Sequence, residues 1–550
     1  MPAPALVLIG VCLLLALLWG LGRLAWLAIA RAEKPPEPLA VLLAGYSSLL
    51  AILQVWHLAL PARTAVWVLV PFSLFGWLLG GKEALRSVVR LARTRPLLLL
   101  AALALLAWVA GRATWPPANA DDALYYVQSV RWNRDYRHLI GLGLLHPYLV
   151  FNHGYHLVVA AVELGPFVDH GASVINSALL LPALWAGVAG LERLPRNSAA
   201  SRPFDAFSGL LLAPVLDVTT HSFSSPSADI AVLCLGAWLA LVLLRPALDA
   251  STPTTDGRVV LGVFAGVAAC ATKQAAIWSA APLAAFVMIE RLRASPGTRW
   301  KLLGWSAVAG AIVAVPWVVR GLLASGYVLF PSDAFNLRLP WRVDEVDARS
   351  LYDHAHRYAR RSGLPWDASL GSLGWLPPWL GSEVLDNRRF LIPVSLSVLL
   401  SVWSVLRRRR LSHCSLWPVA VPWVGLALWF LVMPDTRFAG PLLWLPAAIS
   451  FGLLSSTVTW TAADRIAWLG TALLAAGGAF IGSTAPAWRT ELASPRHDLP
   501  GATFILKSGE TVRIDSHKSC YDVPCAWKKV EGLRLRTPGD LGGGFAIERK

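Results

Sequence analysis

The sequence is poor in charged residues, which make up only 15% of its 550 positions. A soluble domain carries about 25% charged residues. Because 56% of this chain is hydrophobic, its composition favours a protein embedded in a membrane. The chain also lacks an internal repeat and a low-complexity segment, and its apolar first thirty residues lack the basic start and cleavage site of a signal peptide. We therefore interpret this first stretch as a retained membrane helix.

Acidic residues are scarce relative to basic ones, 33 against 49, which gives a net charge of +16. Such an excess can indicate nucleic-acid binding, but here Lys and Arg lie in short loops between apolar runs. Basic residues in such loops set the orientation of membrane helices. The pattern therefore predicts membrane lipid as a partner and no nucleic acid. The 27 Trp residues fit this interpretation, since indole rings gather at membrane interfaces.

Cysteine is also rare, with six residues. Cys520 and Cys525 lie in the polar C-terminal tail with four residues between them. In an oxidising compartment these two can form a disulfide, and the alternative is a pair of free thiols. The other four lie in or beside apolar runs, as small core residues do: Cys12, Cys234, Cys270 and Cys414.

Fourteen apolar segments are candidates for membrane spans. They lie near residues 4–30, 38–60, 65–80, 96–111, 172–190, 205–217, 228–244, 259–272, 275–290, 302–324, 390–406, 414–433, 439–457 and 464–483. The segments 205–217 and 259–272 are short, and short helices at membrane depth are tolerated where protein or a water-filled cavity covers them. The predicted fold is an all-α polytopic membrane protein with about 14 transmembrane helices and a small β-rich C-terminal subdomain.

Alternate connections carry the positive charges, at 82–95, 193–202, 291–301 and 407–410. The positive-inside rule places these connections in the cytoplasm. Residues 153–168 are apolar enough to span, but a span there would place 407–410 outside, so we interpret them as a helix on or dipping into the outer surface. The expected organisation is N-terminal transmembrane helices (1–111), an external loop (112–171), transmembrane helices (172–324), a second external loop (325–389), C-terminal transmembrane helices (390–483) and an external tail subdomain (484–550).

An adjacent acidic pair, Asp121 and Asp122, is the strongest local signal for chemistry. It follows a Pro-Pro break and precedes an expected helix, whose positive N-terminal dipole favours carboxylates. One carboxylate can accept a proton from an attacking hydroxyl while the other orients it or holds a metal ion. The alternative is that the pair only caps the helix.

The same predicted loop carries aromatic, basic and histidine side chains that are candidates for substrate binding: Tyr125, Tyr126, Arg131, Trp132, His146 and His153. His153 and His156 can share a helix face, either as metal ligands or as hydrogen-bonded interfacial residues, and their spacing is not a specific zinc signature. A divalent metal ion is therefore a candidate cofactor, and no metal ligand is assigned.

Short turns predicted on the same side add four more candidates for substrate binding: Asp229, Lys273, Asp435 and Arg437. One of these turns also contains His221. Ionisable residues next to membrane spans are costly and mark substrate or ion pathways. The alternative for each is a solvated charge or half of a structural ion pair.

This set of residues suits a lipid-phosphate substrate. Lys and Arg near the membrane interface can hold a phosphate or diphosphate headgroup. Aromatic rings such as those of Tyr125, Tyr126 and Trp132 can face a sugar ring. The expected reaction is displacement at an activated sugar carbon, in which an aspartate takes the proton of the acceptor and a cation stabilises the departing phosphate.

The acidic pair in a long first external loop resembles the GT-C superfamily of membrane glycosyltransferases, which use polyprenyl-phosphate-linked sugars on the external face. Stretches such as "DDALYYVQSVRWNRDYRHLIGLGLLH", "FNHGYH", "SSPSADI", "PDTRFAG" and "CYDVPC" are similar to a family of bacterial multi-pass membrane proteins, the LIC_10190 type. The resemblance runs from about residue 115 to the C-terminus. It implies that Asp121 or Asp122 is the catalytic acid or base and that Lys273 and Arg437 contact the lipid phosphate. The expected location is a bacterial inner membrane, with which the abundance of Arg, Ala and Leu is compatible.

Four functions remain open from the sequence. The first is a GT-C-like glycosyltransferase that modifies a cell-envelope glycan, lipid or protein. A polyprenyl-linked saccharide transporter or flippase should have a polar path reaching both sides, often with internal repeats. An oligosaccharide polymerase would suit the second loop, 325–389. A non-catalytic assembly protein would tolerate the loss of both aspartates.

Overall fold

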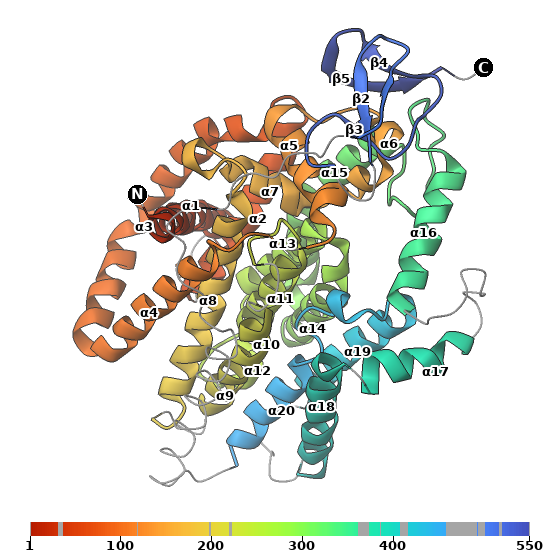
Figure 1. Cartoon of the computed structure of the whole chain (residues 1–550). Helices are drawn as coiled ribbons and strands as arrows, with labels where there is room; N and C mark the ends of the chain where they lie inside the picture. Colours follow the sequence, from red (N-terminus) through yellow and green to blue (C-terminus); the bar gives the residue numbers. More distant parts are fainter. Residues whose placement is uncertain are drawn as a thin grey trace.

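The computed structural model describes residues 2–30, 37–117, 119–196, 200–218, 223–360, 373–385, 387–407, 416–457, 492, 501–515 and 520–548. Helices dominate the chain, and a small β region lies at its C-terminal end (Figure 1). The predicted span 464–483 and His221 fall outside the described residues.

Seven helices within this described part are long and apolar enough to cross a membrane, which indicates a membrane protein. They are α1 (Ala3–Ala30), α2 (Pro38–His57), α3 (Val66–Thr94) with the preceding turn η1 (Ala62–Ala65), α8 (Gly171–Arg193), α14 (Ile277–Ala294) with η6 (Gln274–Ala276), α15 (Arg299–Ser325) with η7 (Pro296–Thr298), and α18 (Arg388–Leu406). Four shorter apolar helices accompany them: α4 (Pro96–Arg112), α11 (Asp229–Leu243), α19 (Trp417–Val432) and α20 (Leu445–Ser455).

The other helices pack between these or connect them. They are α5 (Val127–Asp135), α6 (Leu142–Leu145), α7 (Gly154–Val162), α9 (Arg202–Leu210), α10 (Leu212–Asp217), α12 (Arg245–Leu248), α13 (Asp256–Thr272), α16 (Glu345–Arg360) and α17 (Leu376–Trp379). Single turns of 3₁₀ or π helix complete the set: η2 (Asp122–Tyr126), η3 (Pro147–Val150), η4 (Gly165–Phe167), η8 (Leu373–Trp375), η9 (Leu380–Leu385) and η10 (Thr436–Phe438).

Several helices differ in length from the predicted spans, so the fourteen expected spans are not all present as long helices in the described part. α3 continues through the predicted basic connection to Thr94, because its Lys, Glu, Arg, Ala and Leu residues are strong helix formers. The segment 205–217 divides into α9 and α10. α7 has nine residues, about 14 Å of helix, and all but its last residue are buried within the protein.

Glycines allow the first three helices to pack backbone against backbone. A Cβ atom at Gly22 would lie 1.8 Å from the Val41 carbonyl oxygen, and one at Gly45 would lie 1.9 Å from the Leu18 carbonyl oxygen. Small residues at such crossings are typical of membrane helices, because association there depends on close van der Waals contact. At the α1–α2 crossing, a larger residue in place of Gly22 or Gly45 would therefore separate the helices.

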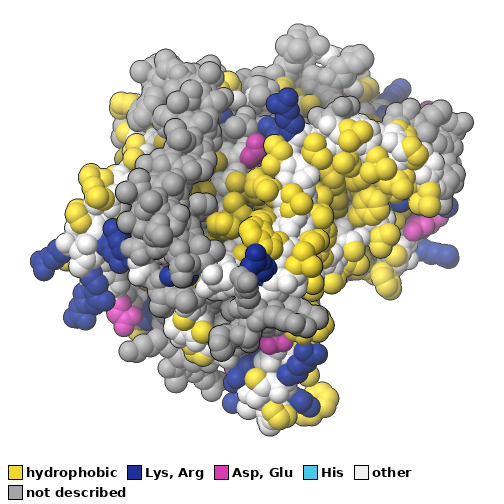
Figure 2. Space-filling model, turned by 90° about the horizontal axis from the view of Figure 1, so that it is seen from below, with side chains coloured by type: hydrophobic (Ala, Val, Ile, Leu, Met, Phe, Trp, Pro, Cys, Tyr) yellow, Lys and Arg dark blue, Asp and Glu magenta, His cyan; other side chains and the backbone are white. Residues whose placement is uncertain are grey.

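Large apolar side chains remain on the outer surface of the bundle, as expected for lipid contact. Leu78 of α3 is 82% exposed and Trp300 of α15 is 87% exposed. Figure 2 shows hydrophobic side chains covering a broad area of the face seen from below, with Lys and Arg at its rim. A soluble monomer rarely exposes an apolar surface of this extent.

The β region packs on one end of the helical bundle, here called the β end (Figure 1). β1 (Thr503–Ile505) pairs antiparallel with β2 (Thr511–Ile514), which pairs parallel with β3 (Cys525–Ala526). β4 (Leu533–Thr537) and β5 (Asp540–Ile547) form an antiparallel pair with an irregularity at residues 535–537.

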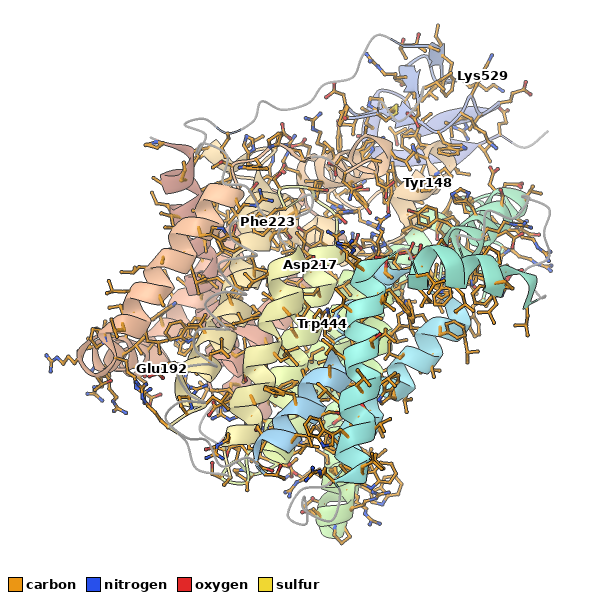
Figure 3. The ribbon with its side chains drawn as sticks, turned by 60° about the horizontal axis from the view of Figure 1, so that its bottom comes forward. Tyr148, Glu192, Asp217, Phe223, Trp444 and Lys529 are labelled. Carbon is orange, nitrogen blue, oxygen red and sulfur yellow. A yellow bond between two sulfur atoms is a disulfide. The ribbon has the colours of Figure 1, made fainter. Side chains whose placement is uncertain are left out.

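The β region shares a hydrophobic cluster with the segment that follows α5. Phe545 of β5 packs edge-on against Trp132, and its backbone N–H donates to the Ile140 carbonyl at 2.9 Å. Figure 3 places Tyr148 between the strands and the bundle, with Glu192 toward the opposite end. The tail is therefore a docked part of the fold, held against the first predicted external loop.

Candidate functional site

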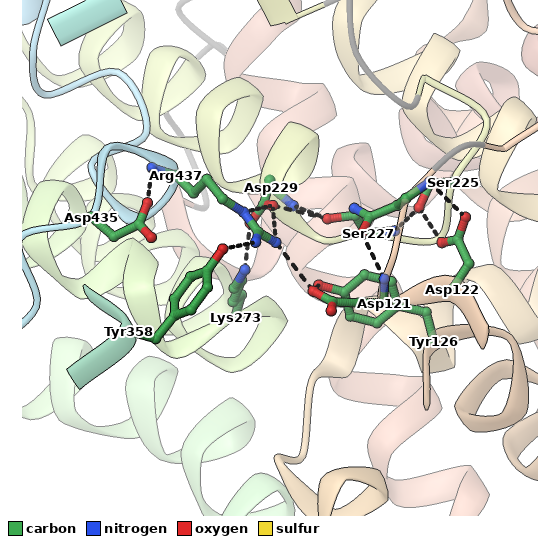
Figure 4. A network of polar contacts seen from close by, with 11 residues as sticks. Asp121, Asp122, Tyr126, Ser225, Ser227, Asp229, Lys273, Tyr358, Asp435 and Arg437 are labelled. Atoms are coloured by element: carbon green, nitrogen blue, oxygen red, sulfur yellow. Dashed lines mark hydrogen bonds and ion pairs between the residues drawn. The ribbon is translucent and has the colours of Figure 1, made fainter. Parts of the chain in front are cut away.

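An ion-pair network at the β end brings together side chains from four distant parts of the chain (Figure 4). Arg437, in the turn between α19 and α20, contacts Asp229 through Nε at 3.4 Å and Nη2 at 3.3 Å. Lys273, at the end of α13, pairs with the other oxygen of the same carboxylate. Asp229 begins α11, where the N-terminal dipole stabilises a negative charge. Asp229 thus joins two cations that lie 164 residues apart in the sequence.

Asp121 joins this network through the same Arg437 nitrogen that contacts Asp229. Nη2 of Arg437 lies 3.4 Å from Asp121 Oδ2, and Tyr126 Oη donates to the same oxygen at 3.4 Å. Nη1 of Arg437 donates to Tyr358 Oη of α16 at 3.3 Å. The Asp121 side chain is 24% exposed and that of Arg437 is 32% exposed, so both are open to solvent and to a ligand.

Asp122 has a different environment from its neighbour. It is fully buried, accepts a hydrogen bond from Ser225 Oγ, and accepts another from the Asn119 backbone N–H at 3.1 Å. These contacts tie the first loop to the turn that precedes α11. Asp122 therefore shapes the site, whereas Asp121 presents a carboxylate to it.

Asp435 fixes the turn that carries Arg437. Its side chain accepts the Arg437 backbone N–H at 2.8 Å, and its carbonyl accepts the Trp429 indole N–H at 3.0 Å. The Lys273 ammonium lies 5.1 Å from the ring centre of Phe438 in the same turn, within cation–π range. The short sequence "PDTRF" thus positions both cations of the network.

The ionisation of the site follows from its neighbours. Burial lowers the pKa of Arg437, but Asp229 and then other neighbours outweigh burial and hold it above its ordinary value. Burial raises the pKa of Tyr126, and Asp229 and Asp121 raise it further, so the phenol stays protonated. The centre of the network thus contains two carboxylates, Asp121 and Asp229, and two cations, Lys273 and Arg437.

Of the residues predicted from sequence, the structure brings Asp121, Asp229, Lys273 and Arg437 into direct contact, with Tyr126 and Asp435 bonded to them and Asp122 close by. Tyr125 lies behind Tyr126, with ring centres 4.5 Å apart, and His153 lies 6.4 Å from Tyr125. Burial lowers the pKa of His153, and His156 and Lys273 lower it further, so its ring is neutral.

Three other predicted residues lie outside the network and contact the tail or its surroundings. Arg131 is buried, pairs with Asp169 at 3.2 Å, and also pairs with Asp522 of the tail. Trp132 is buried against Phe545. His146 is buried 5.6 Å from the Trp527 ring, and burial lowers its pKa to about 3. These side chains bind the protein to itself and leave no surface for a substrate.

Sequence reasoning missed four residues of the network. Ser225 and Ser227 bond to Asp122 and Asp229, and Asn119 holds both backbone and side chain of the acidic pair. A signal for the serines was present, because Ser and Asp just before a helix favour such turns. Tyr358 has no local signal, since its contact depends on how α16 folds back over the site.

The structure also bears on the two tail cysteines and on a possible metal site. Cys520 and Cys525 are joined by a disulfide. In the same described part, no three His, Cys, Asp or Glu side chains are grouped so that they could hold a metal ion. The described side chains of the site are carboxylates, cations and a phenol.

Comparison with known proteins gives one match. A family model described as "Domain of unknown function (DUF8201)" matches residues 5–444, a range that includes the whole network and ends before the β region. No curated protein and no solved structure matches the chain. Since the family model covers most of the sequence, the protein belongs to the family described as Domain of unknown function (DUF8201).

Proposed function

We propose that the protein is a GT-C-like membrane glycosyltransferase that transfers a sugar from a polyprenyl-phosphate donor to a cell-envelope acceptor. The observation that supports it best is the shared ion pair of Arg437 with Asp121 and Asp229. Lys273 pairs with the same Asp229, so the network presents one partly exposed carboxylate, Asp121, and two cations. Cations near the membrane interface can hold the phosphate of a lipid-linked sugar.

In the proposed reaction Asp121 is the general base. The acceptor hydroxyl gives its proton to the Asp121 carboxylate while its oxygen forms a bond to the anomeric carbon of the donor. The bond from that carbon to the phosphate oxygen breaks, and its electron pair leaves with the polyprenyl phosphate. Lys273 and Arg437 stabilise the charge that develops on this oxygen.

The long contacts of Arg437 suit this role. Its bonds to the two carboxylates measure 3.3–3.4 Å, at the weak end for charge-assisted hydrogen bonds. A phosphate can therefore exchange with Asp121 as the partner of Arg437. Donor binding would then release the Asp121 carboxylate to act as the base.

The proposed orientation places the β end outside the cytoplasm, in a bacterial inner membrane, with further spans to make about fourteen. Basic residues gather at the opposite end, where Arg193 pairs with Asp205 at 3.0 Å and Arg291 with Asp256 at 2.6 Å. The positive-inside rule supports a cytoplasmic location for that end.

A saccharide polymerase is the second candidate. It is favoured by one contact, since Tyr358 of the second predicted loop bonds to Arg437. The two functions differ in their products, because a polymerase extends a chain of repeats whereas the transferase adds one sugar.

The test uses a deletion strain that carries Asp121→Asn, Asp122→Asn or the control Asp256→Asn, which changes a carboxylate at the opposite end. With equal amounts of protein in the membrane, we expect Asp121→Asn to lose the envelope glycan that the wild type restores and Asp256→Asn to restore it. The length distribution of the glycan separates transferase from polymerase. Full restoration by Asp121→Asn would refute the proposed function.

A further inference from the structure

The aromatic residues nearest the acidic pair in sequence cannot receive a sugar. Tyr125 is 7% exposed, Tyr126 is 1% exposed and Trp132 is 2% exposed, so none of the three rings offers an open face to a ligand. Many proteins bind a pyranose ring by laying its C–H face on an exposed aromatic ring. The sugar-binding surface of this site must therefore come from other residues.

Two partly exposed aromatic rings lie beside the site. Trp527 of the tail and Tyr148 of η3 have ring centres 4.8 Å apart. Tyr148 lies 5.7 Å from Tyr125, which in turn contacts Tyr126, the hydrogen-bond donor to Asp121. The pair is thus joined to Asp121 by a continuous row of rings.

The charge of Asp121 also acts on Tyr148. Burial raises the pKa of the Tyr148 phenol, and the charge of Asp121 raises it further. The ring therefore lies within the field of the proposed base while keeping part of its surface open.

The tail holds Trp527 firmly in this position. The Trp527 backbone N–H donates to the Leu145 carbonyl at 3.2 Å, and the Cys520 N–H donates to the Ala123 carbonyl, next to the acidic pair, at 2.9 Å. The Cys520–Cys525 disulfide closes the segment between these anchors, and Asp522 within it pairs with the buried Arg131. These contacts set Trp527 against the first loop as part of one structure.

We propose that Trp527 and Tyr148 form an aromatic platform that binds the pyranose ring of a glycosyl substrate beside Asp121. The C-terminal β region is then a substrate-binding part of the site, contributed from outside the segment that defines the family match. The inference rests on the proposed function for the reaction at Asp121, but binding to the platform needs no catalysis. The pyranose can belong to the lipid-linked donor or to a saccharide acceptor, since both present the same C–H face.

Saturation-transfer NMR on the full-length protein in detergent micelles tests the platform. One probe is a short-chain polyprenyl-phosphate hexose, for the donor, and the other is a free disaccharide, for the acceptor. We expect saturation of the ring protons of one of them, with the C–H face strongest. Trp527→Ala and Tyr148→Leu should each weaken that binding about tenfold.

Matched variants separate binding from docking. Trp527→Phe keeps an aromatic ring and should retain most of the binding. Lys529→Ala changes an exposed neighbour in the tail, labelled in Figure 3, and should have no effect. Hydrogen exchange of residues 123–130 should remain slow in Tyr148→Leu, which leaves the tail's backbone anchors in place.

Three results would overturn the platform: no saturation of either probe by the wild type, unchanged binding in both Trp527→Ala and Tyr148→Leu, or failure of Trp527→Phe to retain binding. The proposed function is judged separately with Asp121→Asn. If that variant binds and still transfers the sugar, the base assignment fails and the platform stands. If it loses transfer while Trp527→Ala and Tyr148→Leu still bind, the platform fails and the function stands.

Discussion

The ion pair between Asp229 and Lys273 should be worth more than a surface pair, because little water reaches it. The Lys273 side chain is 8% exposed and that of Asp229 is 22% exposed. Removing one partner of a buried pair costs about 3–5 kcal/mol. Since Asp229 keeps some water and a second partner in Arg437, we expect Asp229→Asn and Lys273→Met each to lower the free energy of unfolding by about 2–3 kcal/mol.

The double variant removes both charges of the pair, so neither is left without its partner. Its loss in the free energy of unfolding should therefore be smaller than the sum of the two single losses by about 1–3 kcal/mol. The measurement is a double-mutant cycle from unfolding in mixed micelles of mild detergent and SDS. The matched control is the pair of Asp256 and Arg291, whose side chains are 39% and 24% exposed and whose coupling should be below about 1 kcal/mol. A coupling between Asp229 and Lys273 no larger than that of the control pair would refute the account of the network.

Two further predictions concern the rest of the fold. Burial raises the pKa of Glu163 from 4.5 to about 7, although Arg134 opposes the shift, so the folded state binds more protons than the unfolded state between these values. Stability should therefore fall by up to about 3 kcal/mol as the pH rises through this window, and melting curves at pH 5 and 8 should show that Glu163→Gln removes the slope. Gly22→Ala should separate α1 from α2 and cost about 3 kcal/mol, whereas Gly304→Ala, which meets no atom within 4 Å, should stabilise its helix by up to about 1 kcal/mol in the same melting assay.

The sequence predicted that the charged members of the network lie on one side of the membrane, but it did not predict the ion pairs that join them. Asp229, Lys273 and Arg437 are charges beside apolar runs, and burying such charges is costly unless they find one another. Each sits at the end of a helix, so alternation of helix direction brought them to one end. Residue type and the order of the spans predicted the shared side, whereas the contacts between the side chains came from the structure.

The limits of the sequence appear at Arg131, Trp132 and Trp527. Arg131 and Trp132 lie in the first loop beside the acidic pair, yet they turn away from the network and contact the tail. Trp527 lies far from that loop in sequence and packs against it. Proximity in sequence therefore suggested a role in the site for Arg131 and Trp132 and gave no indication for Trp527. The reason is that docking of the tail depends on surface complementarity, which hydrophobic periodicity does not encode.

The ends of the helices were also only partly predictable from the sequence. Apolar composition located α1, α2, α8 and α15, but it could not place the end of α3, whose polar second half is helical through propensity. Nor could composition show that the nine-residue α7 would be enclosed by protein.

The central claim is that Asp121, and not its neighbour, is the proton acceptor in a sugar transfer from a lipid phosphate. The most direct measurement is the release of polyprenyl phosphate from a short-chain polyprenyl-phosphate hexose by purified protein with a saccharide acceptor. The account predicts release by the wild type and a loss of at least about a hundredfold in Asp121→Asn. Asp122→Asn should show a smaller loss together with lower thermal stability. Equal release by wild type and Asp121→Asn, or no release by a stable wild type from any hexose donor, would contradict the account.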